Sequence, residues 1–192
     1  MRKLALFFVF SLTLISAYAG KYGYYKTYED FKSGNLVEYA KNEIWIDGYG
    51  DKVALILGPK GNKTEVYLKD IYAYLMDGVM YRPVNIGASR GARPITVGQY
   101  ILYTTKGPEP GFDRNNPPVT FISKAMDTKM YYVGDFYKNL DKIAATDPDF
   151  VQLNNGIKNF KGAYIAYRIA QYIMAAPGYV EDVNKIMPPN IK

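Results

Sequence analysis

The 192-residue chain contains no cysteine and no histidine, and only one tryptophan. Without these residues it can form no disulfide, no Ser-His-Asp or Cys-His catalytic system, no haem ligated by histidine and no zinc site of the usual nitrogen and sulfur ligands. A chain without cysteine is also not an N-terminally lipidated lipoprotein. We therefore expect no cofactor and no metal, and the composition leans toward a protein that is not an enzyme.

Clustered charge is also missing. The chain carries 24 Lys+Arg against 18 Asp+Glu, a formal net charge of +6, and these residues are spread along the sequence. Nucleic-acid-binding proteins usually show a basic stripe or a basic helix face, so we expect no nucleic-acid partner. A hydrophobic fraction of 48% with 22% charged residues indicates an ordinary globular protein.

The first nineteen residues have the pattern of a secretory signal peptide. Arg2 and Lys3 precede the apolar stretch 4–15, and Ala17-Tyr18-Ala19 fits the small-x-small cleavage site. The apolar stretch is too short for a membrane-spanning helix, which needs about 20 residues. We expect cleavage at about Ala19, a secreted or periplasmic protein, and no transmembrane segment in the mature chain 20–192.

The mature chain predicts a single α+β domain. Residues 20–133 are β-rich, residues 134–176 are helical, and residues 177–192 form an extended tail. The expected fold is a twisted antiparallel sheet of six to eight strands, or a partial barrel, covered by two or three C-terminal helices. The strands are predicted at 43–46, 52–57, 64–68, 79–84, 97–105, 119–126 and 129–133, and the segment 70–76 is ambiguous between strand and helix.

Turn and cap residues place the remaining elements. A short helical turn is expected at 28–31 and closed by Gly34, and Asp77-Gly78 should form a hairpin turn. Helices are expected from Asp135, from Asp147-Pro148 to Gly156, and over 157–176. The last is largely apolar, but an internal arginine and its short apolar length favour a buried helix over a membrane span. The segment 106–118 holds four of the eleven prolines and should be an exposed loop.

Two aromatic stretches carry a resemblance to a known group of proteins. They are Tyr24-Tyr25-Lys26-Thr27-Tyr28-Glu29-Asp30-Phe31-Lys32-Ser33-Gly34 and the later Tyr131-Tyr132-Val133-Gly134-Asp135-Phe136 with Asp147-Pro148-Asp149-Phe150. The first resembles the Y-x-[ST]-Y-x-D-F opening of uncharacterised secreted proteins of Bacteroidetes, and the second is similar to a later part of that group. The resemblance implies an exported bacterial protein and assigns no catalytic residue.

The segment 85–94 is the strongest candidate for an anion site. Ser89 and Gly91 offer backbone amides, and Arg90 and Arg93 offer guanidinium groups for a carboxylate or phosphate. The segment is not a P-loop, because it lacks the Gly-Lys-Ser/Thr ending. A solvated hairpin loop between strands that end near Val84 and begin near residue 95 explains the same residues and is favoured.

Tyrosine is unusually abundant, with 20 residues. Four of them cluster near the mature N-terminus, at Tyr22, Tyr24, Tyr25 and Tyr28, and a second group lies in the last predicted helix. Tyrosine supplies a large contact area with a polar tip, so the first group could form an aromatic surface for a sugar or a partner protein. For the second group, a place at the edge of the core is favoured.

Two acidic segments are weaker candidates. Asp47 and Asp51 flank a flexible turn, but calcium loops supply more acidic ligands, so a plain turn is favoured and no metal site is predicted. Glu109 and Asp113 could form a paired-carboxylate site of the glycosidase kind, with Arg114 beside them. Such a site needs a rigid frame, which a proline-rich loop does not offer, so solvated charges are favoured.

These observations favour an exported bacterial protein that binds a ligand or has a structural role in the cell envelope. A partner could be an envelope glycan or another envelope protein. Two alternatives stay open: a hydrolase or transferase that acts on envelope polymers through carboxylates and tyrosines, and an anion-binding module that uses Arg90 and Arg93.

Overall fold

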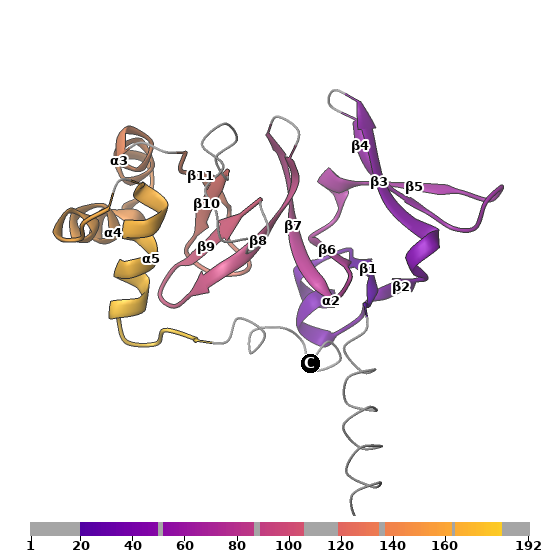
Figure 1. Ribbon diagram of the computed structural model, residues 1–192, viewed down its shortest axis with the longest axis horizontal. Helices are drawn as coiled ribbons and strands as arrows, with labels where there is room; N and C mark the ends of the chain where they lie inside the picture. The colour runs from indigo at the N-terminus through magenta and orange to yellow at the C-terminus, as the bar shows by residue number, and fades with distance from the viewer. Residues whose placement is uncertain are drawn as a thin grey trace, which may run out of the picture. The chain divides into compact units, whose positions relative to one another are not determined.

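A computed structural model describes residues 20–49, 52–86, 89–105, 119–134, 137–162 and 164–181. It contains an eight-stranded antiparallel sheet in the order β11-β10-β9-β8-β7-β6-β1-β2 and a three-stranded sheet in the order β3-β4-β5 (Figure 1). With three helices near the C-terminus, the fold is α+β, as predicted. None of the described helices is long and apolar enough to cross a membrane.

The chain divides into two compact units, residues 1–83 with 187–192 and residues 84–186. The single domain that we expect over residues 20–192 stays a prediction. The described elements of the first unit are β1 (Tyr22–Tyr25), α2 (Tyr28–Ser33), β2 (Val37–Tyr39), β3 (Ile44–Tyr49), β4 (Lys52–Leu57), β5 (Thr64–Tyr67), β6 (Ala73–Met76) and most of β7 (Val79–Ile86), with 3-10 turns at Lys41–Glu43 and Leu68–Asp70. Those of the second unit are β8 (Ser89–Val97), β9 (Ile101–Thr104), β10 (Thr120–Ser123), β11 (Tyr131–Tyr132), α3 (Tyr137–Thr146), α4 (Val151–Gly156) and α5 (Ile165–Ala175), with 3-10 turns at Pro148–Phe150 and Ile157–Asn159.

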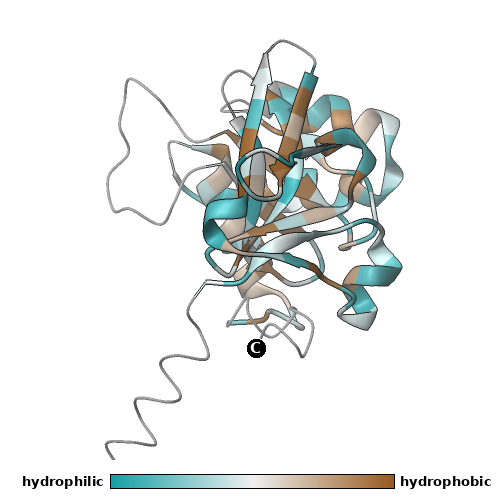
Figure 2. Ribbon diagram, turned by 90° about the vertical axis from the view of Figure 1, so that its right-hand side faces the viewer, coloured by the Kyte–Doolittle hydropathy of each residue, from teal (hydrophilic) through white to brown (hydrophobic). Residues whose placement is uncertain are grey.

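In the first unit, one face of the sheet formed by β3, β4 and β5 packs against the face of the larger sheet that β1 and β6 form. Strand alternation sends Tyr22 and Tyr24 of β1 to the same side as Tyr74 of β6, where they meet Leu55 and Leu57 of β4. Apolar and polar residues follow each other along the same strands (Figure 2). The opposite side of β1 carries Tyr25, which α2 covers. The three-stranded sheet therefore has an inner face in the core and an outer face away from it.

Helix α2 confirms the short helical turn predicted from sequence. Its N-cap is Thr27, whose hydroxyl oxygen accepts from the Asp30 amide at 3.1 Å, while a carboxylate oxygen of Asp30 accepts from the Thr27 amide at 3.0 Å. These two bonds form a capping box, which satisfies amide groups that the first helical turn leaves without a partner. Gly34 ends the helix at φ 73°, a left-handed conformation that glycine adopts without strain.

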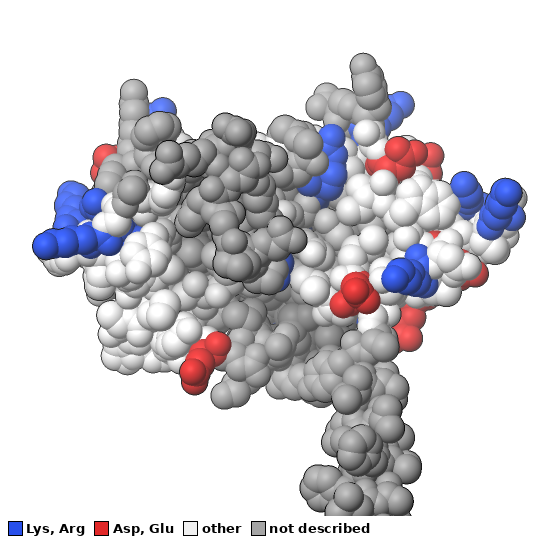
Figure 3. All heavy atoms as spheres, in the orientation of Figure 1, with Lys and Arg blue, Asp and Glu red and all other residues white. Residues whose placement is uncertain are grey.

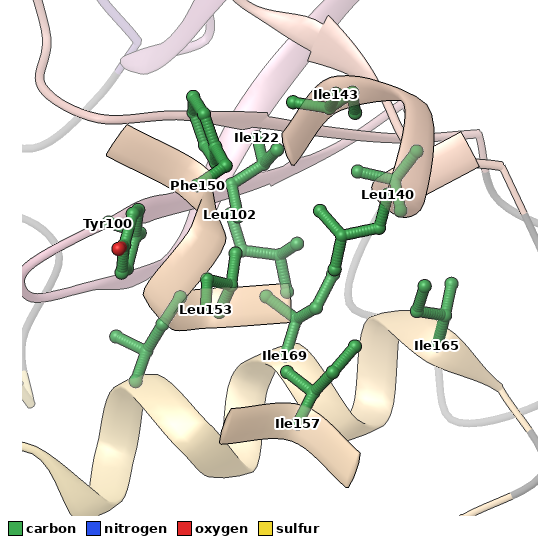
Figure 4. Close-up of a cluster of buried hydrophobic side chains, with 12 residues drawn as sticks. Tyr100, Leu102, Ile122, Leu140, Ile143, Phe150, Leu153, Ile157, Ile165 and Ile169 are labelled. Atoms are coloured by element: carbon green, nitrogen blue, oxygen red, sulfur yellow. The ribbon is translucent and has the colours of Figure 1, made fainter. Parts of the chain in front are cut away.

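The second unit has core residues on both faces of its strands. On one face Leu102 and Ile122 pack against Leu140 of α3, Leu153 of α4 and Ile169 of α5, as Figure 4 shows. On the other face the cluster is formed by side chains of alternate positions, namely Ala92, Val97, Ile101, Tyr103 and Phe121. The three C-terminal helices thus cover one face of these strands, which confirms that part of the predicted fold.

Several predicted boundaries are wrong. The strand expected over 97–105 is two strands, because Val97 ends β8 and residues 98–100 turn the chain into β9. The strand expected over 119–126 ends at Ser123. Asp47 does not begin a turn, since it lies in β3 and pairs with Ala54. The expected loop 106–118 and the helix start at Asp135 lie outside the described residues.

In the helical third, α4 ends at Gly156, as predicted. The φ of this glycine is −67°, which is helical, and the chain continues directly into the 3-10 turn. A Cβ atom at this position would lie 2.0 Å from Cε2 of Tyr172, so the glycine is needed for the close approach of α5. The last helix begins at Ile165 rather than at residue 157, and Arg168 Nε donates to the Gly162 carbonyl at 2.8 Å just before it.

Candidate functional site

The predicted anion-site residues lie in a strand rather than in a flexible loop. Ser89, Arg90, Gly91 and Arg93 all belong to β8, and Ala92 between them is fully buried. The expectation of a solvated loop from 85 to 94 is therefore wrong, because the chain folds into β7 up to Ile86 and into β8 from Ser89. Successive side chains of a strand point to opposite faces, so positions 90 and 93 lie on opposite faces of the sheet. This placement does not support one anion held by both guanidinium groups.

The N-terminal tyrosines also differ in placement from the predicted aromatic surface. Tyr22 and Tyr25 are buried, and only Tyr24 and Tyr28 are partly exposed. The ring of Tyr25 meets Phe31 edge-on, with centroids 5.4 Å apart. Burial raises the pKa of the Tyr25 phenol to about 12, with a smaller contribution from the Glu38 carboxylate. These tyrosines mainly build the core of the first unit.

An aromatic surface exists elsewhere in the first unit, on the outer face of β3–β5. The pairing register places Trp45 beside Ile56 and Glu65 in one cross-strand row. The next row on the same face holds Asp47, Ala54 and Tyr67. Here the two aromatic residues belong to the two edge strands, and small or aliphatic residues of β4 separate them.

Trp45 is half-buried and carries a lysine over its ring. The Lys63 ammonium nitrogen lies 4.4 Å from the ring centroid, a cation–π contact. Because Lys63 directly precedes β5 and Trp45 belongs to β3, the lysine side chain must cross the central strand β4. Ile56, which pairs with Trp45 on the outer face, is only 7% exposed.

Tyr67 repeats this arrangement on the opposite edge strand. Its exposed fraction is 36%, and the Lys69 ammonium nitrogen lies 5.8 Å from the ring centroid. The Tyr67 hydroxyl donates to a carboxylate oxygen of Glu65 at 3.4 Å. This bond holds the phenol tip next to an acidic group, so Tyr67 presents both a ring and a polar edge.

Positive and negative side chains are interspersed on this outer face. We call six of its partly or fully exposed residues the platform: Trp45, Asp47, Lys63, Glu65, Tyr67 and Lys69. Lys52 of β4 is exposed on the same face. Neither Lys63 nor Lys69 has a carboxylate within 4.0 Å among the described residues. On the side of the molecule drawn in Figure 3, blue and red side chains are interspersed over β3–β5.

The buried hydroxyl groups of the second unit have structural partners. The Tyr100 hydroxyl donates to the Asp149 carbonyl at 2.8 Å, and Tyr131 donates to the Asp147 carboxylate at 3.0 Å. Burial raises the pKa of Tyr100, and the bond to Asp147 raises the pKa of Tyr131. Neutral phenols held in this way are poor nucleophiles and poor bases, so they do not point to catalysis.

No metal site emerges from the part of the chain that the structure describes. Within it, no three acidic side chains gather closely enough to hold a metal ion. Asp51, Glu109, Asp113 and Arg114 lie outside the described residues, so the calcium and glycosidase hypotheses are not tested there. Comparisons of the chain with family models, with curated proteins and with solved structures gave no significant match.

The sequence did not point to the platform, because tyrosines are densest near the mature N-terminus. The alternation of Glu65 and Lys69 with Val66 and Leu68 correctly predicts a strand with one polar face. Tyr67 falls in the polar register of that strand, and the only tryptophan of the chain falls in a predicted strand nearby. A large aromatic residue among the polar positions of a strand is the sequence signal that would have indicated an exposed aromatic surface.

Proposed function

We propose that this is an exported, non-enzymatic protein of the bacterial envelope that binds a glycan on the platform. The observation that carries the proposal is the pair of partly exposed rings, Trp45 and Tyr67, on one face of a three-stranded sheet. Tryptophan and tyrosine are the residues that most often dominate binding surfaces, because their large rigid rings lose little entropy on contact.

The spacing of the rings suits an extended ligand. Two strand spacings and two residues along the strand put the Cα atoms of Trp45 and Tyr67 about 12 Å apart. A chain of linked sugars offers flat C–H faces to such rings at separated points, and its hydroxyl groups pair with charged groups between them. Glu65 and Asp47 accept hydrogen bonds from hydroxyl groups, and the lysines donate to sugar oxygens.

A binding experiment tests the platform directly. The mature protein is incubated with insoluble cell-wall polysaccharides, and the bound fraction is compared between wild type, Trp45→Ala and Tyr67→Ala. The matched control is Tyr167→Ala on α5, which removes another exposed tyrosine, 55% accessible, from the second unit. We expect both platform variants to lose most of the binding and the control to keep it. Absence of wild-type binding to every polysaccharide would contradict the proposal.

Export is a separate part of the proposal. It is supported by the signal-peptide pattern of residues 1–19 and by the resemblance of the segment after it to secreted proteins of Bacteroidetes. Mass spectrometry of periplasmic and medium fractions should find a mature chain that begins near residue 20. A full-length chain that starts at Met1 in the cytosol would overturn this part and leave the binding measurement unaffected.

A further inference from the structure

Helix α5 in the second unit carries a stripe of large side chains on the side that its core contacts leave uncovered. The three isoleucines of the helix are buried, whereas Tyr167 and Met174 on the opposite side are 55% and 52% exposed. Because seven residues make almost two helical turns, these two side chains lie on one line along the helix. Tyr164, just before the helix, adds a ring that is 36% exposed. Exposed apolar surface of this kind marks contact with a partner or a membrane.

Basic side chains stand at the N-terminal end of this stripe. Lys158 and Lys161 are exposed and precede the helix. Arg168 Nε donates to the Gly162 carbonyl at 2.8 Å, and a Cβ atom at Gly162 would meet Cδ1 of Tyr167 and Cγ of Arg168. The tyrosine ring and the arginine side chain therefore lie beside the same backbone segment, directly after Lys161.

Acidic residues are absent from this part of the sequence. Residues 151–180 contain three basic residues and no acidic one, and Asp149 and Glu181 border the segment. The elements with the most extensive contacts to α5 are β8, β9, α4 and the 3-10 turn Ile157–Asn159, and none of them contains Asp or Glu. The stripe thus has positive charge at its N-terminal end and no carboxylate along its length.

We propose that α5 docks on an anionic lipid surface through this stripe and the basic residues beside it. Tyrosine is enriched at membrane interfaces, because its ring enters the apolar region while its hydroxyl group stays among the headgroups. Met174 adds apolar area, and lysine and arginine bind lipid phosphate groups. Docking of this kind keeps the helix on the surface and needs no membrane-spanning segment. The inference is independent of the platform, which belongs to the first unit.

A second copy of the chain fits the stripe less well than a lipid surface does. The 11-residue helix is about 16 Å long and about 10 Å wide, so its uncovered side projects an area of about 160 Å². Each partner of a stable protein complex buries about 800 Å². A lipid surface needs no matching shape, and each inserted side chain and each bound headgroup adds to the affinity.

Vesicle binding of the mature protein tests the inference. The bound fraction is measured by sedimentation with vesicles of phosphatidylcholine alone and with vesicles that contain an equal amount of phosphatidylglycerol. We expect at least about tenfold tighter binding to the anionic vesicles at about 50 mM salt, and a smaller preference at about 500 mM salt. Equal binding to both kinds of vesicle, or binding to neither, overturns the inference.

Two double variants separate the apolar contact from the charge contact. Tyr167→Ala with Met174→Ala should weaken binding to the anionic vesicles at least about tenfold, because most of the inserted area is lost. Lys158→Gln with Lys161→Gln should remove most of the preference for phosphatidylglycerol and most of the salt dependence. Unchanged binding of either double variant overturns the inference.

Matched controls come from the first unit. Lys26→Gln with Lys60→Gln removes two exposed lysines, and Tyr67→Ala removes an exposed tyrosine of the platform. Both should bind vesicles like wild type, and an equal loss in these controls contradicts docking through α5. Thermal melting shows that each variant is folded, and the wild-type comparison of the two vesicles depends on no variant. Self-association that the Tyr167 and Met174 substitutions abolish, without vesicle binding, also overturns the inference.

Discussion

The two units contain the same cation–aromatic contact in two different settings. In the second unit the Lys124 ammonium lies 4.4 Å from the ring centroid of Tyr100, which is fully buried and packs against Phe150. In the first unit the Lys63 ammonium lies at the same 4.4 Å from the Trp45 ring, which is only half-buried. The local geometry is equal, and the surroundings of the ring differ.

The difference shows that burial, and not the contact itself, separates a structural ring from a binding ring. Tyr100 lies beneath the C-terminal helices, where it fills the core and its hydroxyl group has a protein partner. Trp45 stands on the side of a sheet whose other side already faces a core. Removing the first ring should damage stability, and removing the second should damage binding.

The largest expected effect is the loss of Tyr100. Tyr100→Ala should lower the free energy of unfolding by about 3–5 kcal/mol, the usual cost of emptying a buried aromatic site. Trp45→Ala should lower it by no more than about 2 kcal/mol, because the ring is partly in water already. Urea unfolding of both variants measures the two losses of unfolding free energy, and equal losses would contradict the expected difference. Tyr100→Phe, which removes only the bond to Asp149, should cost about 1 kcal/mol.

Alkaline pH should give the next largest effect, through Tyr25 on the covered face of β1. Its pKa is raised to about 12, so the folded state keeps the neutral phenol longer than the unfolded chain, whose phenols have a pKa of 10.0. This contribution is complete below pH 10, and it is lost as the pH rises through about 12, by at most about 3 kcal/mol. Stability of Tyr25→Phe should depend less on pH in this range. A wild-type unfolding free energy that stays constant from pH 10 to 12 would be inconsistent with the buried phenol.

A smaller effect is expected where α4 and α5 approach each other. Gly156→Ala places a methyl group against the ring of Tyr172 and should cost about 1–3 kcal/mol through overpacking. Asn155→Ala, at an exposed position of the same helix, is the matched control and should change stability by less than about 0.5 kcal/mol. Thermal melting distinguishes the two variants, and equal melting temperatures would show that the close approach is not maintained.

The smallest expected effect concerns the cap of α2. Thr27→Ala should cost about 1 kcal/mol, because the Asp30 amide loses its side-chain acceptor. Hydrogen bonds from Thr27 hold the pKa of the Asp30 carboxyl below its usual value of 3.8, so the cap stabilises the protein above that value and is lost as the pH falls through the lowered pKa. Acid titration of wild type and variant, followed by circular dichroism, should show a difference that shrinks toward low pH.

Much of the fold could be predicted because its signals are local. Period-2 alternation and turn residues located β4, β5 and the hairpin at Asp77-Gly78, and the C-terminal helices follow from caps and spacing. The end of α4 at Gly156 was predicted, whereas the end of β8 at Val97 was not. Gly98 follows Val97, but a single glycine inside a strand pattern is a weak turn signal, so one strand was predicted through it.

Less of the candidate site than of the fold could be predicted from the sequence. Tyr22 and Tyr25 are close in the chain, yet the alternation of β1 and the cover of α2 bury both of them. Trp45 and Tyr67 are 22 positions apart by their numbers, and only the pairing of β3, β4 and β5 brings them to one face. Cross-strand register depends on non-local pairing, which a single sequence does not display.

The most direct test of the platform is a calorimetric titration of one soluble glycan that wild-type protein binds, repeated with Tyr67→Ala and with Tyr167→Ala. We expect the Tyr67 variant to bind at least about tenfold more weakly, a loss of about 1.4 kcal/mol, with an unchanged melting temperature. The Tyr167 variant should match wild type. Equal affinity of all three proteins, or an equal loss in both variants, would contradict the assignment of binding to the outer face of β3–β5.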